Sequence, residues 1–152
     1  MDDSLTTYFE IRTFGDSLKI EVLEYITYNS DLDWDNNWLR TEISVGCGDF
    51  SGTYIAELMT LEFKELRNQF DYLYHNLTAS TLFKDRENQL SFEIKGNGNG
   101  NFELEGIAYG SSSEYCAKLY FTLHFDQSYI PGFIKMLDTI LQQYPVIGNF
   151  RA

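Results

Sequence analysis

Basic residues are few in this sequence: 11 Lys and Arg stand against 23 Asp and Glu, giving a formal net charge of −12 over 152 residues. Nucleic-acid binding depends on neutralising phosphates with Lys and Arg, so a chain this acidic is a poor candidate for it. A strongly negative surface instead attracts basic proteins and speeds their association. The composition therefore predicts a basic protein partner and no nucleic acid.

Signals for export or membrane insertion are also missing. No apolar run approaches the roughly 18 residues that a membrane-spanning helix needs. The opening stretch MDDSLTTYFE has neither the basic region nor the apolar core of a signal peptide. The 2 cysteines, Cys47 and Cys116, are too few for a disulfide framework. We therefore expect a cytoplasmic protein without membrane contact, whose two thiols are free and partly buried.

Proline is scarce, with 2 residues, whereas 43% of the chain is hydrophobic and 16% aromatic. This composition argues against disorder, and the length is sufficient for one well-packed core. We expect one domain over residues 1–152. The 2 cysteines and 2 histidines are too scattered for a zinc site, and no cofactor motif is present, so we expect no cofactor.

The first third of the chain alternates apolar and polar residues, as strands with one wet face do. Gly15-Asp16 is typical of a hairpin turn, and the stretch GCGDFSG, residues 46–52, is typical of another. The strands predicted from this pattern cover residues 9–14, 18–24, 38–46 and 54–58.

The spacing of the apolar residues then changes. Residues 61–77 carry apolar side chains at intervals of three and four, which predicts an amphipathic helix that Thr60 caps at its start. The residues assigned to its polar positions include Glu62, Lys64, Glu65 and Asp71.

The last third repeats this arrangement. Further strands are predicted over residues 81–83, 90–95, 102–108 and 115–125. A second helix follows from Ile130 to Tyr144, with Pro131 in its first turn and Pro145 after its end. The order ββββ-α-ββββ-α predicts an α+β fold: a largely antiparallel sheet or sandwich of about eight strands with two amphipathic helices.

The stretch DLDWDNNWLRTE, residues 31–42, has the spacing of a calcium loop. Asp31, Asp33 and Asp35 fall at positions 1, 3 and 5, and Glu42 falls at position 12. However, Asn36 stands where calcium loops have Gly, and period-two patterns flank the stretch where an EF-hand has helices. An acidic turn between two strands explains the same residues. A calcium-binding module therefore stays as an alternative interpretation.

Negative charge is concentrated around this stretch. Residues 1–59 hold 12 acidic and 3 basic residues, whereas residues 60–152 hold 11 acidic and 8 basic residues. Trp34, between two aspartates, is expected to be exposed, and Trp38, at the head of a strand, to be a core residue. A purely structural module whose charge serves solubility is one alternative, and an acid–base hydrolase with two carboxylates across a cleft is another. No catalytic motif is present, so we do not expect an enzyme.

Three stretches stand in a distinctive order: the acidic segment running into DNNWL (residues 35–39) and the turn GDFSG (residues 48–52), the leucine-rich helix over residues 61–77, and the closing DQSYI (residues 126–130) with YPV (residues 144–146). Together they resemble the WapI family of bacterial immunity proteins. Such proteins are encoded beside contact-delivered toxins of the WapA type, as in contact-dependent growth inhibition, and some of these toxins carry nuclease domains that act on transfer RNA. The resemblance implies a non-enzymatic inhibitor of a cognate toxin.

The charge pattern adds a site to this expectation. A toxin that handles RNA needs a basic cleft, and a compact acidic protein can be steered into such a cleft and block it. We therefore predict that the turn presents its carboxylates as phosphate mimics. The predicted interface residues are Asp31, Asp33, Trp34, Asp35 and Asn36.

Overall fold

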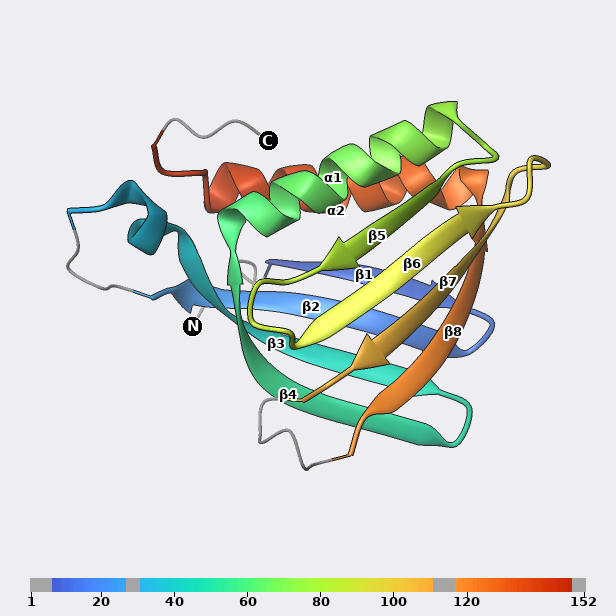
Figure 1. Ribbon diagram of the computed structural model, residues 1–152, viewed down its shortest axis with the longest axis horizontal. Coiled ribbons are helices and arrows are strands. Elements are labelled where there is room, and N and C mark those ends of the chain that lie inside the picture. The colour runs from blue at the N-terminus through green and yellow to red at the C-terminus, as the bar shows by residue number, and fades with distance from the viewer. Residues whose placement is uncertain (1–6, 27–30, 111–116, 149–152) are drawn as a thin grey trace.

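The computed structural model describes residues 7–26, 31–110 and 117–148. It contains two four-stranded antiparallel sheets and two helices in the order ββββ-α-ββββ-α, as the sequence predicts (Figure 1). The first sheet comprises β1 (Thr7–Thr13), β2 (Asp16–Tyr25), β3 (Trp38–Cys47) and β4 (Phe50–Met59), and α1 (Thr60–His75) follows it. The second sheet comprises β5 (Ser80–Lys84), β6 (Leu90–Gly96), β7 (Asn101–Ala108) and β8 (Leu119–Asp126), and α2 (Ile130–Gln143) follows it.

Within each sheet, consecutive strands of the chain pair with each other, so both sheets are simple meanders. Side chains along a strand point to alternate faces, and burial follows that alternation: Phe9 and Ile11 of β1 are fully buried, whereas Tyr8 is exposed. The alternation read from the sequence therefore identified the core face of these strands correctly.

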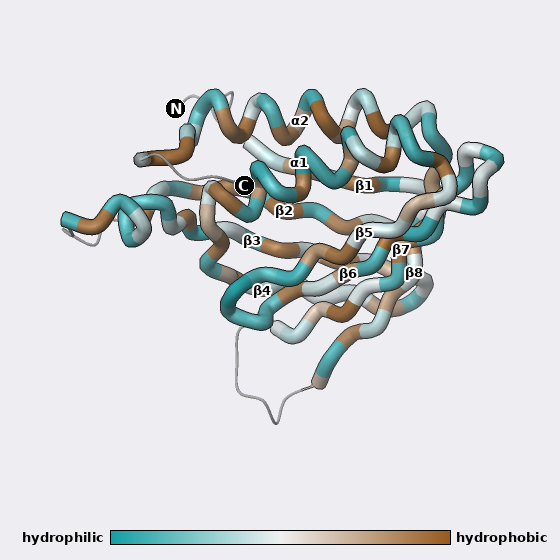
Figure 2. Tube along the Cα trace, turned by 45° about the horizontal axis from the view of Figure 1, so that its top comes forward, coloured by the Kyte–Doolittle hydropathy of each residue, from teal (hydrophilic) through white to brown (hydrophobic). Residues whose placement is uncertain are grey.

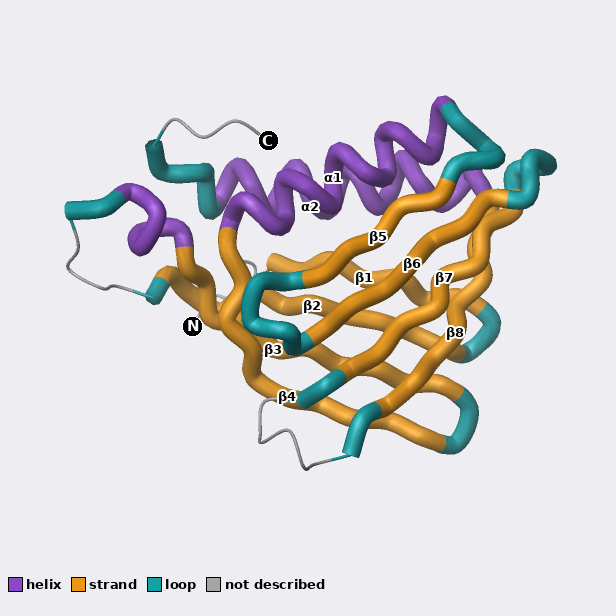
Figure 3. The backbone as a smooth tube through the Cα atoms, in the orientation of Figure 1, coloured by secondary structure: helices purple, strands orange, loops and turns teal. Residues whose placement is uncertain are grey.

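The two helices lie side by side and cover the sheets along one border of the molecule (Figures 1 and 3). Hydrophobic and hydrophilic residues alternate along both, as expected of helices with one buried face (Figure 2). Four phenylalanines from different elements meet beneath them. The ring of Phe133 on α2 lies 5.7 Å from Phe9 on β1, 5.1 Å from Phe70 on α1 and 5.2 Å from Phe125 on β8, measured between centroids. This aromatic cluster joins both sheets to both helices.

Several element boundaries differ from the prediction, among them those of α1 and β8. Thr60 is the first residue of α1 rather than its cap, and the helix ends at His75, two residues before Leu77. Strand β8 begins at Leu119, because its partner β7 ends at Ala108, which is paired with Leu119. Of the residues predicted to start that strand, Tyr115 and Cys116 lie outside the described part of the chain.

The remaining cysteine, Cys47, is a free thiol of intermediate burial, as predicted. Among the described residues, no helix is long and apolar enough to cross a membrane.

Candidate partner-binding site

The acidic segment, residues 31–36, connects β2 to β3 and projects beyond the end of the first sheet (Figures 1 and 3). A short 3-10 helix, Asp33–Asn37, forms most of it, and the N–H of Asp35 donates to the carbonyl oxygen of Leu32 at 3.1 Å. Asp31, Leu32, Asp33 and Trp34 are exposed, whereas Asp35 and Asn36 are half-buried. The segment therefore presents carboxylates and apolar side chains to solvent together.

The segment is anchored by Asn37, whose side chain is fully buried. Its Nδ2 donates to the carbonyl oxygens of Asp33 at 2.7 Å and Ile147 at 2.8 Å. Its Oδ1 accepts from the N–H of Ile147 at 2.7 Å and from the hydroxyl of Thr60. One amide thus ties the segment to the start of α1 and to the stretch after α2.

That stretch packs closely on the segment. Gly148 has φ +96°, and a Cβ built on it would lie 2.7 Å from the Cβ of Asp33. Any larger residue would therefore clash with Asp33 and also strain the backbone. Nearby, the hydroxyl of Tyr25 on β2 donates to the carbonyl oxygen of Pro145 at 2.9 Å. These contacts fix the path of the chain behind the acidic segment.

Trp34 connects the segment to the turn between β5 and β6. The guanidinium carbon of Arg86 lies 5.0 Å from the centroid of the Trp34 ring, the geometry of a cation–π contact. The same guanidinium approaches Glu62 with an N–O distance of 3.7 Å. The Trp34 ring is therefore held from behind although 38% of the residue is exposed.

Glu62 itself is almost completely buried, with 1% of its surface exposed, so its assignment to the polar face of the helix was wrong. Its carboxylate accepts from the N–H of Met59 at 2.8 Å, closing the first turn of α1, and from the N–H of Arg86 at 2.9 Å. Burial, opposed by these hydrogen bonds and reinforced by the nearby Asp85, raises the pKa of Glu62 to about 7.

Asp85 organises the β5–β6 turn in the same way. It is 2% exposed, and its Oδ1 accepts from the N–H groups of Gln89 at 2.7 Å and Leu90 at 2.9 Å. Its Oδ2 accepts from the N–H of Glu87 at 3.0 Å. These bonds hold the turn that carries Arg86, and Arg86 in turn contacts the Trp34 ring.

Glu42 lies apart from the aspartates. It is on β3, where it is paired with Glu21 of β2 and Ile55 of β4, while Asp33 and Asp35 are in the 3-10 helix. Strands β2 and β3 flank the segment, not the helices of an EF-hand. Within the described ranges, no three His, Cys, Asp or Glu residues are grouped so that they could hold a metal ion.

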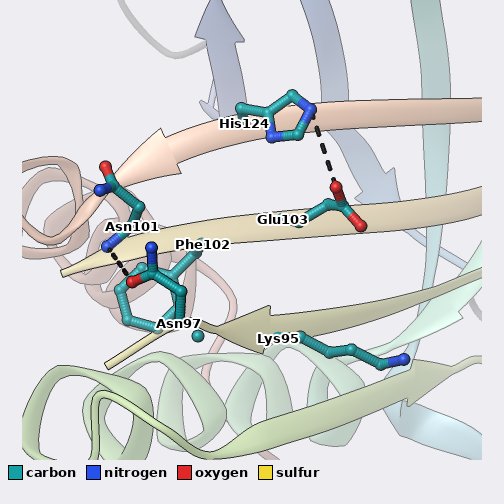
Figure 4. Close-up of a pocket in the computed structure, with 7 residues that line it drawn as sticks. Lys95, Asn97, Asn101, Phe102, Glu103 and His124 are labelled. Carbon is teal, nitrogen blue, oxygen red and sulfur yellow. Dashed lines mark hydrogen bonds and ion pairs between the residues drawn. The ribbon is translucent and has the colours of Figure 1, made fainter. Parts of the chain in front are cut away.

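A second polar site lies on the outer face of the second sheet. Lys95, Glu103 and His124 occupy one row across β6, β7 and β8 and line a hollow of about 310 Å³ (Figure 4). The Nε2 of His124 lies 3.9 Å from a carboxylate oxygen of Glu103. The hollow offers one carboxylate, whereas acid–base glycoside hydrolysis uses two facing each other across a cleft.

Comparison with known protein families identifies the family to which this chain belongs. A family model described as "Immunity protein WapI-like family" matches residues 10–145, nearly the whole chain. The chain therefore belongs to the WapI-like immunity protein family. Membership supports a role as an immunity protein and implies a toxin protein as its partner. No curated protein matches the sequence.

Solved structures resemble the fold at low sequence identity. WHY1 from Arabidopsis thaliana is 10% identical, with a TM-score of 0.52 over 97% of this chain and 89% of that one. The plant transcriptional regulator PBF-2 is 8% identical, with a TM-score of 0.52 over 94% of this chain and 84% of that one. At such identity the likeness concerns the fold alone.

Proposed function

We propose that this protein binds and neutralises a cognate toxin, a basic C-terminal domain of nuclease type, by placing its acidic segment in the toxin's active cleft. The observation that carries the proposal is membership of an immunity family together with an exposed acidic segment that is anchored from behind. The proposal includes action in the cytoplasm, where an incoming toxin domain would meet its substrate. Inhibition then comes from occlusion and involves no chemical step.

The anchoring favours tight binding. Asn37 donates hydrogen bonds to backbone carbonyl oxygens at the buried end of the segment, and Arg86 packs against the Trp34 ring. The segment is therefore already ordered, and little conformational entropy remains to be lost when a partner docks. The exposed Leu32 and Trp34 offer apolar contact area between the carboxylates, and aromatic anchors of this kind dominate many interfaces. The carboxylates of Asp31 and Asp33 would supply long-range attraction to a basic cleft.

The electrostatic part of the proposal is tested by replacing Asp31, Asp33 and Asp35 with Asn together. The control replaces Glu65, Glu103 and Glu105 with Gln, which removes the same charge from exposed positions on α1 and β7. The probe is the C-terminal domain of the toxin encoded next to this chain, studied by stopped-flow fluorescence at several salt concentrations. We expect the first variant to associate about tenfold more slowly at low salt, with a flatter salt dependence, and the control to resemble wild type.

Equal association rates for both variants would exclude the acidic segment as the docking surface. The immunity role itself is tested by growth of cells that express the toxin domain with or without this chain. Protection by the wild-type chain is expected, and unimpaired killing would contradict the role.

A further inference from the structure

The four outer edges of the two sheets differ in how they are covered. Edge strands expose unpaired N–H and C=O groups, and proteins usually cover or interrupt them. Strand β1 lies against α2, where the hydroxyl of Thr7 is bonded to Gln143. On β5, the carbonyl oxygen of Leu82 accepts from Gln69 of α1 at 2.8 Å. On β8, the thiol of Cys47 faces the carbonyl oxygen of Thr122 at 3.8 Å.

The fourth edge, β4, is likewise covered at one position, Glu57. The side-chain amide of Gln89 accepts from the N–H of Glu57 at 3.0 Å and donates to its carbonyl oxygen at 2.9 Å, as a neighbouring strand would. The backbone of Gln89 is held in turn by the hydroxyl of Tyr54, which donates to its carbonyl oxygen at 2.7 Å. This amide covers the edge at Glu57 and leaves residues 51–55 of β4 uncovered by it.

The open half carries a regular row of hydrogen-bonding groups. Backbone groups in an antiparallel strand point alternately to either side. Glu57 points to the outer edge, while Ala56 points toward β3, where its carbonyl oxygen accepts from Thr41. Ser51, Thr53 and Ile55 therefore point outward as Glu57 does. Among the described residues, no hydrogen bond from beyond the edge reaches the backbone of these three.

Apolar side chains accompany this open row on both faces of the strand. Phe50, on the inner face, is 72% exposed, and Ile55, on the outer face, is 43% exposed. Figure 1 shows β4 along the lower border of the first sheet, with its β3–β4 turn at the end opposite the acidic segment. An added strand would bury both side chains while pairing with the backbone between them.

The charges at the two ends of the open row decide which strand fits. In a two-fold pairing of two copies centred on Thr53, Asp49 of one copy would face Glu57 of the other at both ends. Like charges directly opposite each other are destabilising, and each copy also carries a net charge of −12. A strand with basic residues near its ends meets attraction at the same two positions.

We propose that the open half of β4, residues 51–55, receives an extended segment of the toxin by strand addition. The segment would carry a basic residue near each end and apolar residues between them. This inference rests on the proposed function and gives it a second contact surface. Main-chain hydrogen bonds would supply affinity there, and the side chains beside Phe50 and Ile55 would supply specificity.

The test uses Thr53→Pro, which removes one outward N–H and puts a ring in the path of an added strand, while the backbone bonds from β4 to β3 stay in place. The hydrogen bond from the Thr53 hydroxyl to Oγ of Ser44 on β3, at 3.2 Å, is lost in this variant and equally in its control. Thr53→Val is the matched control, because it keeps the N–H and a β-branched side chain. The probe is the toxin domain named above, measured by calorimetry, with thermal unfolding of each variant recorded alongside. We expect the dissociation constant to rise by about tenfold or more for Thr53→Pro and to stay near wild type for Thr53→Val.

A second measurement needs no variant. Amide hydrogen exchange of the wild-type chain, followed by nuclear magnetic resonance, should slow on toxin binding at Ser51, Thr53 and Ile55. Exchange at Gly52 and Tyr54, whose N–H groups point toward β3, should change little.

The outcomes separate the two proposals. Suppose that the wild-type chain binds the toxin domain. Strand addition is then overturned if Thr53→Pro has the same dissociation constant, or if hydrogen exchange at the outward amides does not slow on binding. Either result leaves the immunity role intact. Absence of any binding by wild type overturns the proposed function. A wild-type dimer in sedimentation that Thr53→Pro converts to monomer assigns the edge to a second copy and contradicts the inference.

Discussion

Asn37 and Ile147 are joined by two hydrogen bonds across 110 residues of sequence: Nδ2 of Asn37 donates to the carbonyl oxygen of Ile147 at 2.8 Å, and Oδ1 accepts from its N–H at 2.7 Å. The side-chain amide thus pairs with a peptide group as a neighbouring strand would. Because this pairing holds the acidic segment in place, the stability of the fold and the shape of the proposed docking surface depend on the same residue.

Replacing Asn37 with Ala should lower the free energy of unfolding by about 3 kcal/mol, since the variant leaves several buried polar groups without a partner. Urea denaturation should show a lower midpoint at an unchanged slope. Asn99→Ala, at an exposed position in the β6–β7 turn, is the control and should change stability by less than about 0.5 kcal/mol. Equal midpoints for the two variants would contradict the anchoring role.

Glu62 should make stability depend on pH. Its pKa is raised from 4.5 to about 7 in the folded state, so the folded state holds this proton more tightly than the unfolded state does. The resulting stabilisation is complete below about pH 4.5 and is lost as the pH rises through 7, amounting to about 3 kcal/mol. The free energy of unfolding, measured by urea denaturation from pH 4 to 8, should fall with rising pH by about 3 kcal/mol more for wild type than for Glu62→Gln. Glu65→Gln, at an exposed position of α1, is the matched control for removing one carboxylate from the same helix.

Trp34→Ala should weaken toxin binding and leave the fold stable. Loss of an exposed aromatic anchor supported by Arg86 is expected to raise the dissociation constant roughly 30-fold, or about 2 kcal/mol. Tyr72→Ala, which removes an aromatic residue that is 53% exposed on α1, is the control and should bind as wild type does. Surface plasmon resonance with the toxin domain measures both, and matching constants would remove Trp34 from the interface.

Two glycines should respond to alanine in opposite directions. A Cβ on Gly106 of β7 would lie 2.4 Å from the ring of Phe121, so Gly106→Ala should destabilise the protein by about 2 kcal/mol through overpacking. A Cβ on Gly132 of α2 meets nothing within 4 Å, so Gly132→Ala should stabilise it by about 1 kcal/mol through helix propensity. Thermal unfolding of both variants measures the pair, and shifts of the same sign would contradict this packing.

Much of the fold was predictable because burial repeats at a fixed period within each element. The alternation around Phe9 and Ile11 and the helical spacing of the apolar residues in α1 depend on local sequence alone. The start of β8 was not predictable in this way. The alternation continues back to Tyr115, whereas pairing requires a partner, and β7 supplies none beyond Ala108.

The site was predictable only in part for a related reason. The exposure of Trp34 follows from its position between two aspartates, and the structure confirms it. Trp38 was expected in the core and is half-buried. The role of Asn37 and the burial of Glu62 depend on Ile147 and Arg86, which lie 110 and 24 residues away in the chain. A signal was present for Glu62, because a carboxylate at the third position of a helix commonly bonds back to its cap.

The bond between Asn37 and Ile147 also sets an order of events during synthesis. A ribosome that has just added Asn37 must add 110 more residues before Ile147 exists, which takes on the order of ten seconds at typical elongation rates. The first sheet can form earlier, since its strands are consecutive in the chain. A nascent or truncated polypeptide that lacks Ile147 would therefore carry the aspartates without their fixed arrangement, and under the proposed function only a chain extended past Ile147 would capture a toxin.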